Sequence, residues 1–585
     1  MNKIQEAIVK NQLSELVKQG DFNKAELLCS QLLKALPKDV DVWYTFGQVL
    51  QKLNKSEQAV KALLNATQPA SNITRDALKL AVHISQEHKL YALGFMAGQA
   101  LLQNNPVDVE TYFTHGMFGS CLNLDYLANH FYQKAIDINP NDKRYRLYNA
   151  KALNHLGRTT EALEQYQAAI DLDDRDDEPY FRRLFAQNYS QYLEEETVVQ
   201  SHKAYGERLE KRFPKVDKFK PRELSSRVKI GYVSKDFATH SVAYFFLAMI
   251  QGHDSKMFEV YCYSDGAPAD EDAITEKIKA GADHWVPSLG LSDNALCQRI
   301  RKDRIDILVD LLGMTGNPRM SVYAQRAAPV QINYLGYPNT CGLSRMDYRI
   351  TDNWTDPVGL TEKHNTETLI RVPSGFLCYT PELPQTTVVD LPALESHVIT
   401  FGSFNVFPKI TDKMLKLWTE ILLSVPDSKL LIKAKLFLEK QNNEIVQQRF
   451  EALGISKERL ILIAFTPDTK SHLEVYNQVD IHLDTFPYNG TTTTCEALWQ
   501  GVPTVTLAGD THRSRVGLSI LNQVGLEDFI AYDASQYVEI AVSVSKDLKK
   551  LSVLRQGMRA RVQNSKLLNA KLFMAEYEAE LKKLI

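Results

Sequence analysis

The sequence has 585 residues, with 68 Lys and Arg against 71 Asp and Glu, so its net charge is −3. This length predicts three or four domains at about 150 residues each. The balanced charge argues against a dedicated nucleic-acid binder, and the longest apolar run, residues 242–250, is too short to span a membrane. The polar start of the chain and seven scattered cysteines without a CxxC pair predict a cytoplasmic protein.

The first third of the chain carries an internal repeat. A small alanine recurs at steps of 34, 33, 36 and 34 residues, at Ala25, Ala59, Ala92, Ala128 and Ala162. Prolines close successive units at positions 37, 69, 106 and 140. A period near 34 residues with this pattern resembles the tetratricopeptide repeat, although an ordinary helical bundle is the alternative. We therefore expect about five repeats over residues 1–175, with a groove that binds polypeptide, and a helical linker over 176–225.

After residue 226, short β-branched runs alternate with helical stretches. A first set of expected strands covers 228–234, 258–264, 306–312, 330–336, 348–352 and 369–373. A second set covers 398–404, 429–434, 460–465, 481–486 and 503–509. Two such β/α alternations predict two doubly wound α/β domains, over 226–390 and 391–565, with a closing helix over 566–585. A ligand would bind in a cleft outside the carboxyl ends of the strands.

Several common ligand motifs are missing from this region. Neither half has GxGxxG after its first strand, and GxxxxGK[ST] occurs nowhere. No DxD follows a strand, and no His and Cys set has the spacing of a zinc site. The sequence therefore predicts no metal and no other cofactor.

The strongest candidate site is the run of four threonines at 491–494, which follows an expected strand and opens an expected helix. Gly490 permits a turn before it, and Glu496 lies near the helix start. Free N–H groups and hydroxyls at a helix N-terminus bind anions, and a nearby carboxylate can accept hydrogen bonds from ribose. The alternative is ordinary helix capping, for which one threonine would be sufficient.

Two further residues follow strands of the second half. Lys409 lies just past the first strand, where its charge could neutralise a leaving diphosphate in a site without metal. His472 lies near the start of an expected helix on the same side, where it could stack on a nucleobase. A solvated lysine and a surface histidine are the alternatives.

In the first half, His240 lies in the loop after the first strand and would face the cleft from the opposite lobe. A histidine there could act as a general base on a hydroxyl or orient an acceptor. His284 is a second candidate, with a packed histidine as the alternative.

These segments together resemble glycosyltransferase family 41, which contains the protein O-GlcNAc transferases and the SPINDLY proteins. The resemblance covers nearly the whole chain and rests on five blocks in order: GYVSKDFATHSVAYF, APVQINYLGYPNTCGLSRMDYRITD, FLCYTP, FGSFN with KI shortly after, and LDTFPYNGTTTTCEALWQGVPTVT. It implies the metal-independent two-lobed fold called GT-B. It also implies transfer of a sugar, with inversion, from a nucleotide sugar to Ser or Thr of a protein bound by the repeats.

The resemblance also implies roles for individual residues. Lys409 matches a lysine that contacts the donor diphosphate, and His472 matches a histidine against the base. Thr492 and Thr493, beside Thr491, match a threonine pair at the diphosphate, and Glu496 matches an acidic ribose ligand. His240 matches a histidine discussed as a catalytic base, a role that is disputed in the family. His284 and Arg326 match further residues of the cleft.

The sequence also departs from the animal O-GlcNAc transferases. Those proteins have His, Asp and Gln where this sequence has Thr491, Glu496 and Val406, and they carry a long insertion between the lobes. Blocks such as HSVAYF and TTTTCE are closer to SPINDLY, whose plant members resemble fucosyltransferases that use GDP-fucose. The resemblance implies UDP-GlcNAc as the donor. The alternatives are GDP-fucose, N-glucosylation of Asn, or a repeat scaffold with an inactive transferase domain.

Overall fold

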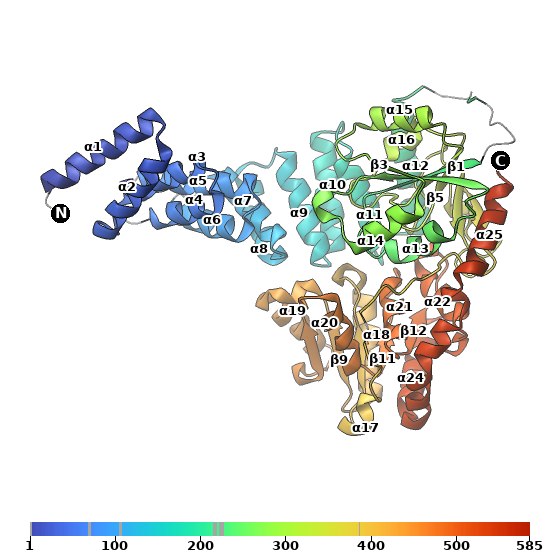
Figure 1. Ribbon diagram of the computed structural model, residues 1–585. Helices are drawn as coiled ribbons and strands as arrows, with labels where there is room; N and C mark the ends of the chain where they lie inside the picture. Colours follow the sequence, from blue (N-terminus) through green and yellow to red (C-terminus); the bar gives the residue numbers. More distant parts are fainter. Residues whose placement is uncertain (1–2, 68–71, 105–107, 215–218, 221–226, 385) are drawn as a thin grey trace. The chain divides into compact units, whose positions relative to one another are not determined.

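The computed structural model describes residues 3–67, 72–104, 108–214, 219–220, 227–384 and 386–585. The chain forms two compact units (Figure 1). One contains residues 1–156 and 164–175, and the other contains residues 157–163 and 176–585. The first unit is helical and the second contains both sheets.

Five successive helix pairs follow one another at the start of the described chain, drawn from blue to cyan in Figure 1. They are α1 (Lys3–Gln19), α2 (Phe22–Ala35), α3 (Val40–Lys52), α4 (Ser56–Asn65), α5 (Asn72–Glu87), α6 (Tyr91–Asn104), α7 (Val109–Cys121), α8 (Asp125–Ile138), α9 (Lys143–His155) and α10 (Thr159–Leu172). Consecutive helices from α1 to α9 pack against each other, as expected of a repeat array. Two of the four repeat-closing prolines, at 69 and 106, lie outside the described residues.

The third repeat corrects one part of the sequence pattern. The expected alanines of the other repeats, Ala25, Ala59, Ala128 and Ala162, are all fully buried at the fourth position of their helix. Ala92 is exposed, and the fourth position of α6 is Gly94. A Cβ at Gly94 would lie 2.4 Å from the ring of Phe118. The third repeat therefore has Gly94 at this position instead of alanine, because the Phe118 ring occupies the space that a methyl group would need.

Two helices connect the repeats to the sheets: α11 (Glu178–Gln187) and α12 (Glu195–Glu210). We call α11, α12 and the segment between them the connector. Its helices belong to the same compact unit as both sheets.

The N-terminal lobe is built on a seven-stranded parallel sheet of order β3-β2-β1-β4-β5-β6-β7. Its strands are β1 (Val228–Ser234), β2 (Phe258–Ser264), β3 (His284–Pro287), β4 (Ile307–Asp310), β5 (Val330–Asn333), β6 (Tyr348–Thr351) and β7 (Thr368–Arg371). Its helices are α13 (Ala243–Gly252), α14 (Ala273–Gly281), α15 (Asp293–Asp303) and α16 (Met320–Ala324). The order places β1 and β4 at the centre, where the strand order reverses and ligands bind in such sheets.

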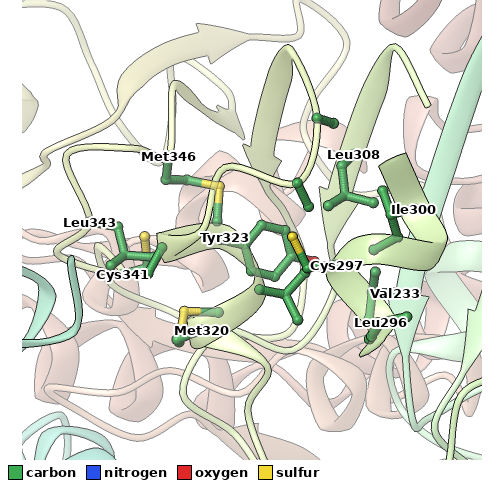
Figure 2. Close-up of a cluster of buried hydrophobic side chains, with 14 of the residues drawn as sticks. Val233, Leu296, Cys297, Ile300, Leu308, Met320, Tyr323, Cys341, Leu343 and Met346 are labelled. Atoms are coloured by element: carbon green, nitrogen blue, oxygen red, sulfur yellow. The ribbon is translucent and has the colours of Figure 1, made fainter. Parts of the chain in front are cut away.

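One core of this lobe lies between the sheet and helices α15 and α16 (Figure 2). Val233 and Leu308 come from the central strands, and Tyr323 comes from α16. Residues from the long loop after β5 complete the cluster: Cys341, Leu343 and Met346. Burial of these apolar side chains fixes the sheet and therefore the loops at its carboxyl edge.

The C-terminal lobe has a six-stranded parallel sheet of order β10-β9-β8-β11-β12-β13. Its strands are β8 (Thr400–Ser403), β9 (Lys429–Lys433), β10 (Leu460–Ile463), β11 (Ile481–Leu483), β12 (Thr504–Leu507) and β13 (Ile530–Ala531). Its helices are α17 (Pro392–Ser396), α18 (Asp412–Ser424), α19 (Lys440–Glu451), α20 (Thr469–Glu474), α21 (Thr492–Trp499), α22 (Val516–Gln523), α23 (Ala534–Lys546) and α24 (Leu548–Gln563). The last helix, α25 (Ala570–Lys582), packs against α13 of the other lobe.

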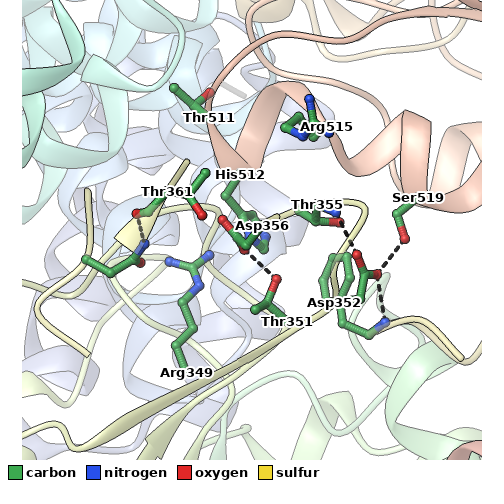
Figure 3. A network of polar contacts seen from close by, with 12 residues as sticks. Arg349, Thr351, Asp352, Thr355, Asp356, Thr361, Thr511, His512, Arg515 and Ser519 are labelled. Atoms are coloured by element: carbon green, nitrogen blue, oxygen red, sulfur yellow. Dashed lines mark hydrogen bonds and ion pairs between the residues drawn. The ribbon is translucent and has the colours of Figure 1, made fainter. Parts of the chain in front are cut away.

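A network of buried polar side chains joins the two lobes (Figure 3). Asp352 of the N-terminal lobe accepts a hydrogen bond from Ser519 of α22 at 2.6 Å. Asp356 lies 2.6 Å from Nδ1 of His512, and Arg515 donates to the carbonyl of Trp354 at 2.9 Å. Because these groups are paired and Asp352, Asp356 and Ser519 are fully buried, the contact between the lobes is specific.

All eleven expected strands are present within about three residues of their expected ends. The sequence pattern missed β3 and β13, because an edge strand of four residues and a strand of two are too short to show periodicity. No helix in the described part of the chain is long and apolar enough to cross a membrane.

Candidate active site

The candidate site lies where β8 and β11 end, since these neighbouring strands are parallel and their loops meet at the same edge. The loop after β8 contains a short 3-10 helix, Phe407–Lys409, and the loop after β11 leads into α21. Lys409 and the threonine run, which the sequence analysis selected separately, therefore come together.

Lys409 is partly buried and makes few contacts. Its Nζ donates to the carbonyl oxygen of Asn489 at 2.7 Å and lies 3.8 Å from the centre of the Tyr488 ring. Burial lowers the pKa of Lys409 to about 8, although the nearby Asp484 carboxylate opposes this shift. An ammonium group has three donors, so this one has capacity for a bound anion.

The loop before α21 is held by Asp484, which is fully buried at the end of β11. Its carboxylate accepts hydrogen bonds from the N–H of Gly490 at 2.6 Å and from the Thr506 hydroxyl at 2.8 Å. Burial raises the pKa of Asp484 to about 6. A Cβ at Gly490 would lie 2.4 Å from Oγ1 of Thr493, so glycine is needed here for close approach. The sequence predicted a turn-permitting role for this glycine.

The threonine run opens α21. Thr491, Thr492 and Thr493 are half-buried, whereas Thr494 is buried and its hydroxyl donates to the carbonyl of Gly490. Thr491 makes no side-chain capping hydrogen bond. Because the first N–H groups of a helix lack partners within the helix, this end offers backbone donors and hydroxyls together. Plain capping therefore does not account for the run.

His472 and Glu496 form a second group beside the run. Nε2 of His472 lies 3.2 Å from the Glu496 carboxylate, and Nδ1 lies 2.7 Å from Nζ of Lys433. Tyr476 also donates to Glu496, at 3.3 Å, and stacks on Phe404 with ring centres 3.7 Å apart. Burial lowers the pKa of Lys433. Lys433 donates to Nδ1, so the neutral ring carries its proton on Nε2, where it faces the carboxylate.

His240 lies in the loop between β1 and α13 of the N-terminal lobe. Its side chain is 45% exposed, and its Nδ1 accepts a hydrogen bond from the N–H of Val242 at 3.3 Å. The buried Asp236 carboxylate lies 3.7 Å from the same nitrogen. Desolvation lowers the pKa of His240. A neutral ring in this arrangement carries its proton on Nε2, so it is a donor on that side.

The two lobes meet near these residues. Tyr244 follows His240 by one turn in α13, and the charge of Glu496 from the other lobe contributes to raising its pKa. The same carboxylate contributes to raising the pKa of Tyr379. Burial is the main cause of both pKa shifts, and the Glu496 carboxylate of α21 adds to it.

His284 and Arg326 do not join this group. The His284 ring stacks on Tyr261 of β2, and its Nε2 lies 2.8 Å from Glu259 near the amino end of that strand. Arg326 bonds Asp347 and the carbonyl of Pro329, which immediately precede β6 and β5. These contacts place Arg326 at the amino ends of its strands, the edge opposite the ligand-binding one. The cleft roles of His284 and Arg326 stay predictions.

The structure adds residues that the sequence reasoning did not select: Lys433, Asp484, Tyr488, Tyr476 and Asn405, whose carboxamide oxygen accepts from Thr493. Three of them had a sequence signal, because Lys433 and Asp484 lie in the second half of expected strands and Asn405 directly follows one. No cluster of three or more His, Cys, Asp or Glu that could hold a metal occurs among the residues the structure describes.

Two parallel-sheet lobes that follow a helical repeat array match the GT-B fold of glycosyltransferases. The chain belongs to glycosyl transferase family 41, whose model matches residues 209–380 and 380–577. A tetratricopeptide repeat model matches residues 16–79. The family and the repeats expected from the sequence are both confirmed.

Curated relatives include plant proteins named probable UDP-N-acetylglucosamine–peptide N-acetylglucosaminyltransferase SPINDLY. The chain is 40% identical to the tomato protein (Solanum lycopersicum) over 404 residues, which is 68% of this chain and 43% of that protein. It is 28% identical to the Arabidopsis thaliana protein named SEC over 343 residues, 57% of this chain and 34% of the relative. The chain therefore spans less than half the length of these relatives.

A solved structure also matches. A lysine-to-methionine variant of an O-GlcNAc transferase from Thermobaculum terrenum superposes with a TM-score of 0.79 at 29% identity. The match covers 91% of this chain and 98% of that one. It confirms the predicted fold, a helical repeat array followed by two parallel-sheet lobes.

Proposed function

We propose that this protein is a protein O-glycosyltransferase that transfers N-acetylglucosamine from UDP-GlcNAc to Ser or Thr, with inversion. The observation that carries the proposal is the meeting of the Lys409 ammonium group and the threonine-rich start of α21 at neighbouring strand ends. A cation beside free helix N–H groups is suited to a diphosphate. Membership of family 41 and the names of the relatives support the same activity.

Each proposed role follows from the chemistry of an inverting transfer. The acceptor hydroxyl oxygen forms a bond to the anomeric carbon while the bond from that carbon to the diphosphate oxygen breaks. Lys409 and the hydroxyls and N–H groups of Thr491, Thr492 and Thr493 stabilise the negative charge that develops on the leaving diphosphate. The residues present can thus supply the charge without a cofactor.

The remaining roles concern the nucleoside and the acceptor. Glu496 accepts hydrogen bonds from the ribose hydroxyls, and His472 packs against the base. His240 orients the acceptor hydroxyl, since its Nδ1 is already bonded to the N–H of Val242. The proton of the acceptor leaves to water as the new bond forms, because Nδ1 of the neutral His240 ring already accepts from Val242 and Nε2 carries a proton.

The repeats over 1–175 would recruit the acceptor polypeptide, and the lobes over 226–390 and 391–565 would carry out the transfer. In this division of labour, the segment over 176–225 links the repeats to the lobes, and the helix over 566–585 closes the chain. We expect no nucleic-acid partner and no membrane span. The seven cysteines are unpaired, which supports the cytoplasm as the compartment.

The test is incubation of the protein with radiolabelled UDP-GlcNAc and, separately, GDP-fucose, in the presence of a cell extract as acceptor. Transfer from UDP-GlcNAc supports the proposal. Transfer from GDP-fucose alone would show that the proposed donor is wrong, although the protein would still be an O-glycosyltransferase. The SPINDLY relatives, more similar than SEC, justify the second arm. No transfer and no hydrolysis with either donor would leave the inactive scaffold as the better account.

A further inference from the structure

The lysine of the proposed phosphate site is supported by one loop. Its ammonium group contacts the Tyr488 ring and the Asn489 carbonyl, which belong to neighbouring residues of the segment between β11 and α21. That segment is fixed in turn. The Thr485 hydroxyl donates to the carbonyl of Tyr488 at 2.8 Å, and the N–H of Asn489 donates to the carbonyl of Arg513 at 2.9 Å. The loop therefore presents a ring face and a carbonyl to the lysine in a defined geometry.

The ring of Tyr488 also contacts the connector. It stacks on Tyr189, with ring centres 5.5 Å apart and planes 24° apart. Tyr189 is only 6% exposed and follows the end of α11. Its neighbour Asn188, fully buried, donates to the Tyr337 hydroxyl of the N-terminal lobe at 3.1 Å. The tyrosine that lies under Lys409 thus rests on a residue held by the other lobe.

The same stretch of the connector contacts the protein on the other side of Lys409. The side-chain oxygen of Gln191 accepts from the N–H of Lys413 at 2.9 Å, near the start of α18. Glu195 pairs with Arg513, whose carbonyl holds Asn489. The connector therefore touches both of the segments that carry and support the lysine.

We infer that Tyr488, backed by Tyr189 of the connector, is a positioning residue that holds the ammonium group of Lys409 at the donor diphosphate. The inference rests on the proposed function of the site and names residues that the proposed roles do not include. A lysine has four rotatable side-chain bonds, so it needs support to lie in one place. A ring face attracts a cation, and this attraction strengthens when water is excluded.

The experiment isolates the diphosphate from the rest of the nucleotide. The dissociation constants of UDP and uridine, and of GDP and guanosine, are measured by calorimetry on the full chain. One of the two pairs, UDP with uridine or GDP with guanosine, should bind. For that pair, the dissociation constant of the nucleoside divided by that of the nucleoside diphosphate measures how much the phosphates add to affinity. We expect Tyr488→Leu to reduce this ratio about fivefold to tenfold while nucleoside affinity stays unchanged. Tyr488→Phe keeps the ring and should keep the ratio within about twofold.

The connector supplies a second variant and a matched control. Tyr189→Leu should reduce the same ratio about twofold to threefold, because it removes the stacking partner and leaves Tyr488 in place. Tyr180 stacks on Tyr205 within the same connector, and among the described residues no hydrogen bond or ring contact joins it to the segment between β11 and α21. Tyr180→Leu should therefore leave the ratio unchanged. If Tyr488→Leu does not fold, Tyr189→Leu against Tyr180→Leu still decides the question.

The pH dependence of kcat/KM is a second readout, which a general loosening of the fold would not shift. The ring stabilises the charged lysine, so the alkaline fall in kcat/KM should shift to lower pH in Tyr488→Leu and remain in place in Tyr488→Phe. An unchanged phosphate ratio and an unchanged alkaline limb in Tyr488→Leu would overturn the inference. A wild-type protein that gains nothing from the phosphates of either nucleotide would instead refute the proposed function.

Discussion

The two lobes share a doubly wound parallel sheet, but the carboxyl edges of the two sheets differ in charge. In the C-terminal lobe, Lys409 and Lys433 reach the edge, and burial lowers the pKa of both. In the N-terminal lobe, the central strand ends in Asp310, whose pKa burial raises to about 6 and which accepts backbone N–H bonds from Leu312 and Gly313. One edge offers cations to a ligand, while at the other Lys235 is paired with Asp236 and backbone N–H groups are bonded to Asp310.

The doubly wound fold alone therefore does not determine which lobe binds the ligand. Both sheets have a switch point where a ligand could bind. Backbone N–H groups at the first switch point are already bonded to Asp310. At the second, Asp484 takes the N–H of Gly490 and leaves the start of α21 for an anion. The donor should therefore bind to the C-terminal lobe and the acceptor should approach from the side of His240.

Removal of the Lys409 cation is expected to have the largest effect on activity. Lys409→Ala should lower kcat by about 10² to 10³, because the leaving diphosphate loses a preorganised charge in a partly buried site. Steady-state transfer from the nucleotide sugar measures the loss. Activity within a few-fold of wild type would show that the phosphates bind elsewhere.

The N-terminal side is tested through His240. His240→Ala should lower kcat about tenfold to 100-fold while nucleotide affinity, measured by calorimetry, stays the same, since the residue acts on the acceptor. His240→Gln keeps a donor and should retain more activity than the alanine variant. A loss of nucleotide affinity in both variants would contradict the division of labour between the lobes.

The helix start should matter less than the lysine. The double variant Thr492→Val and Thr493→Val should weaken the binding of the nucleoside diphosphate about tenfold, because two hydroxyl donors are lost while the backbone N–H groups remain. Nucleoside binding is the control and should not change.

The pH dependence follows from the pKa of Lys409, which burial lowers to about 8. The ammonium group is charged below this value and loses its charge as the pH rises through it, so kcat/KM should fall above about pH 8. In Lys409→Ala this alkaline fall should disappear from the residual activity. Its persistence at the same pH would assign it to another group.

The smallest effect is expected at His284, which makes no contact with the Lys409 and Thr491 to Thr493 group among the described residues. His284→Gln should change kcat/KM by less than about twofold, because its partners Glu259 and Tyr261 lie away from the phosphate edge. A loss as large as that of His240→Ala would mean that the His284 side chain moves to the substrate during the reaction.

Much of this arrangement could be predicted from the sequence. Strand periodicity gave the two sheets, and the positions of Lys409, Thr491 to Thr493 and Glu496 after strands brought them to one edge. The position of Arg326 could not be predicted, because it lies two residues before the block that starts at Ala328 and before the strand that follows, so neither pattern assigns it to an edge of the sheet. The contacts of Lys409 with Asn489 and of His472 with Lys433 join residues 80 and 39 positions apart. Only side-chain packing in the folded chain determines such pairs.

The binding position of the donor phosphates is the central prediction for this protein. A crystal structure of the full chain with UDP or GDP measures this directly. We predict phosphate oxygens within hydrogen-bond distance of the Lys409 ammonium group and of the N–H groups that open α21, with the base beside His472. Phosphates bound at the carboxyl ends of β1 and β4, near Asp310, would contradict the account.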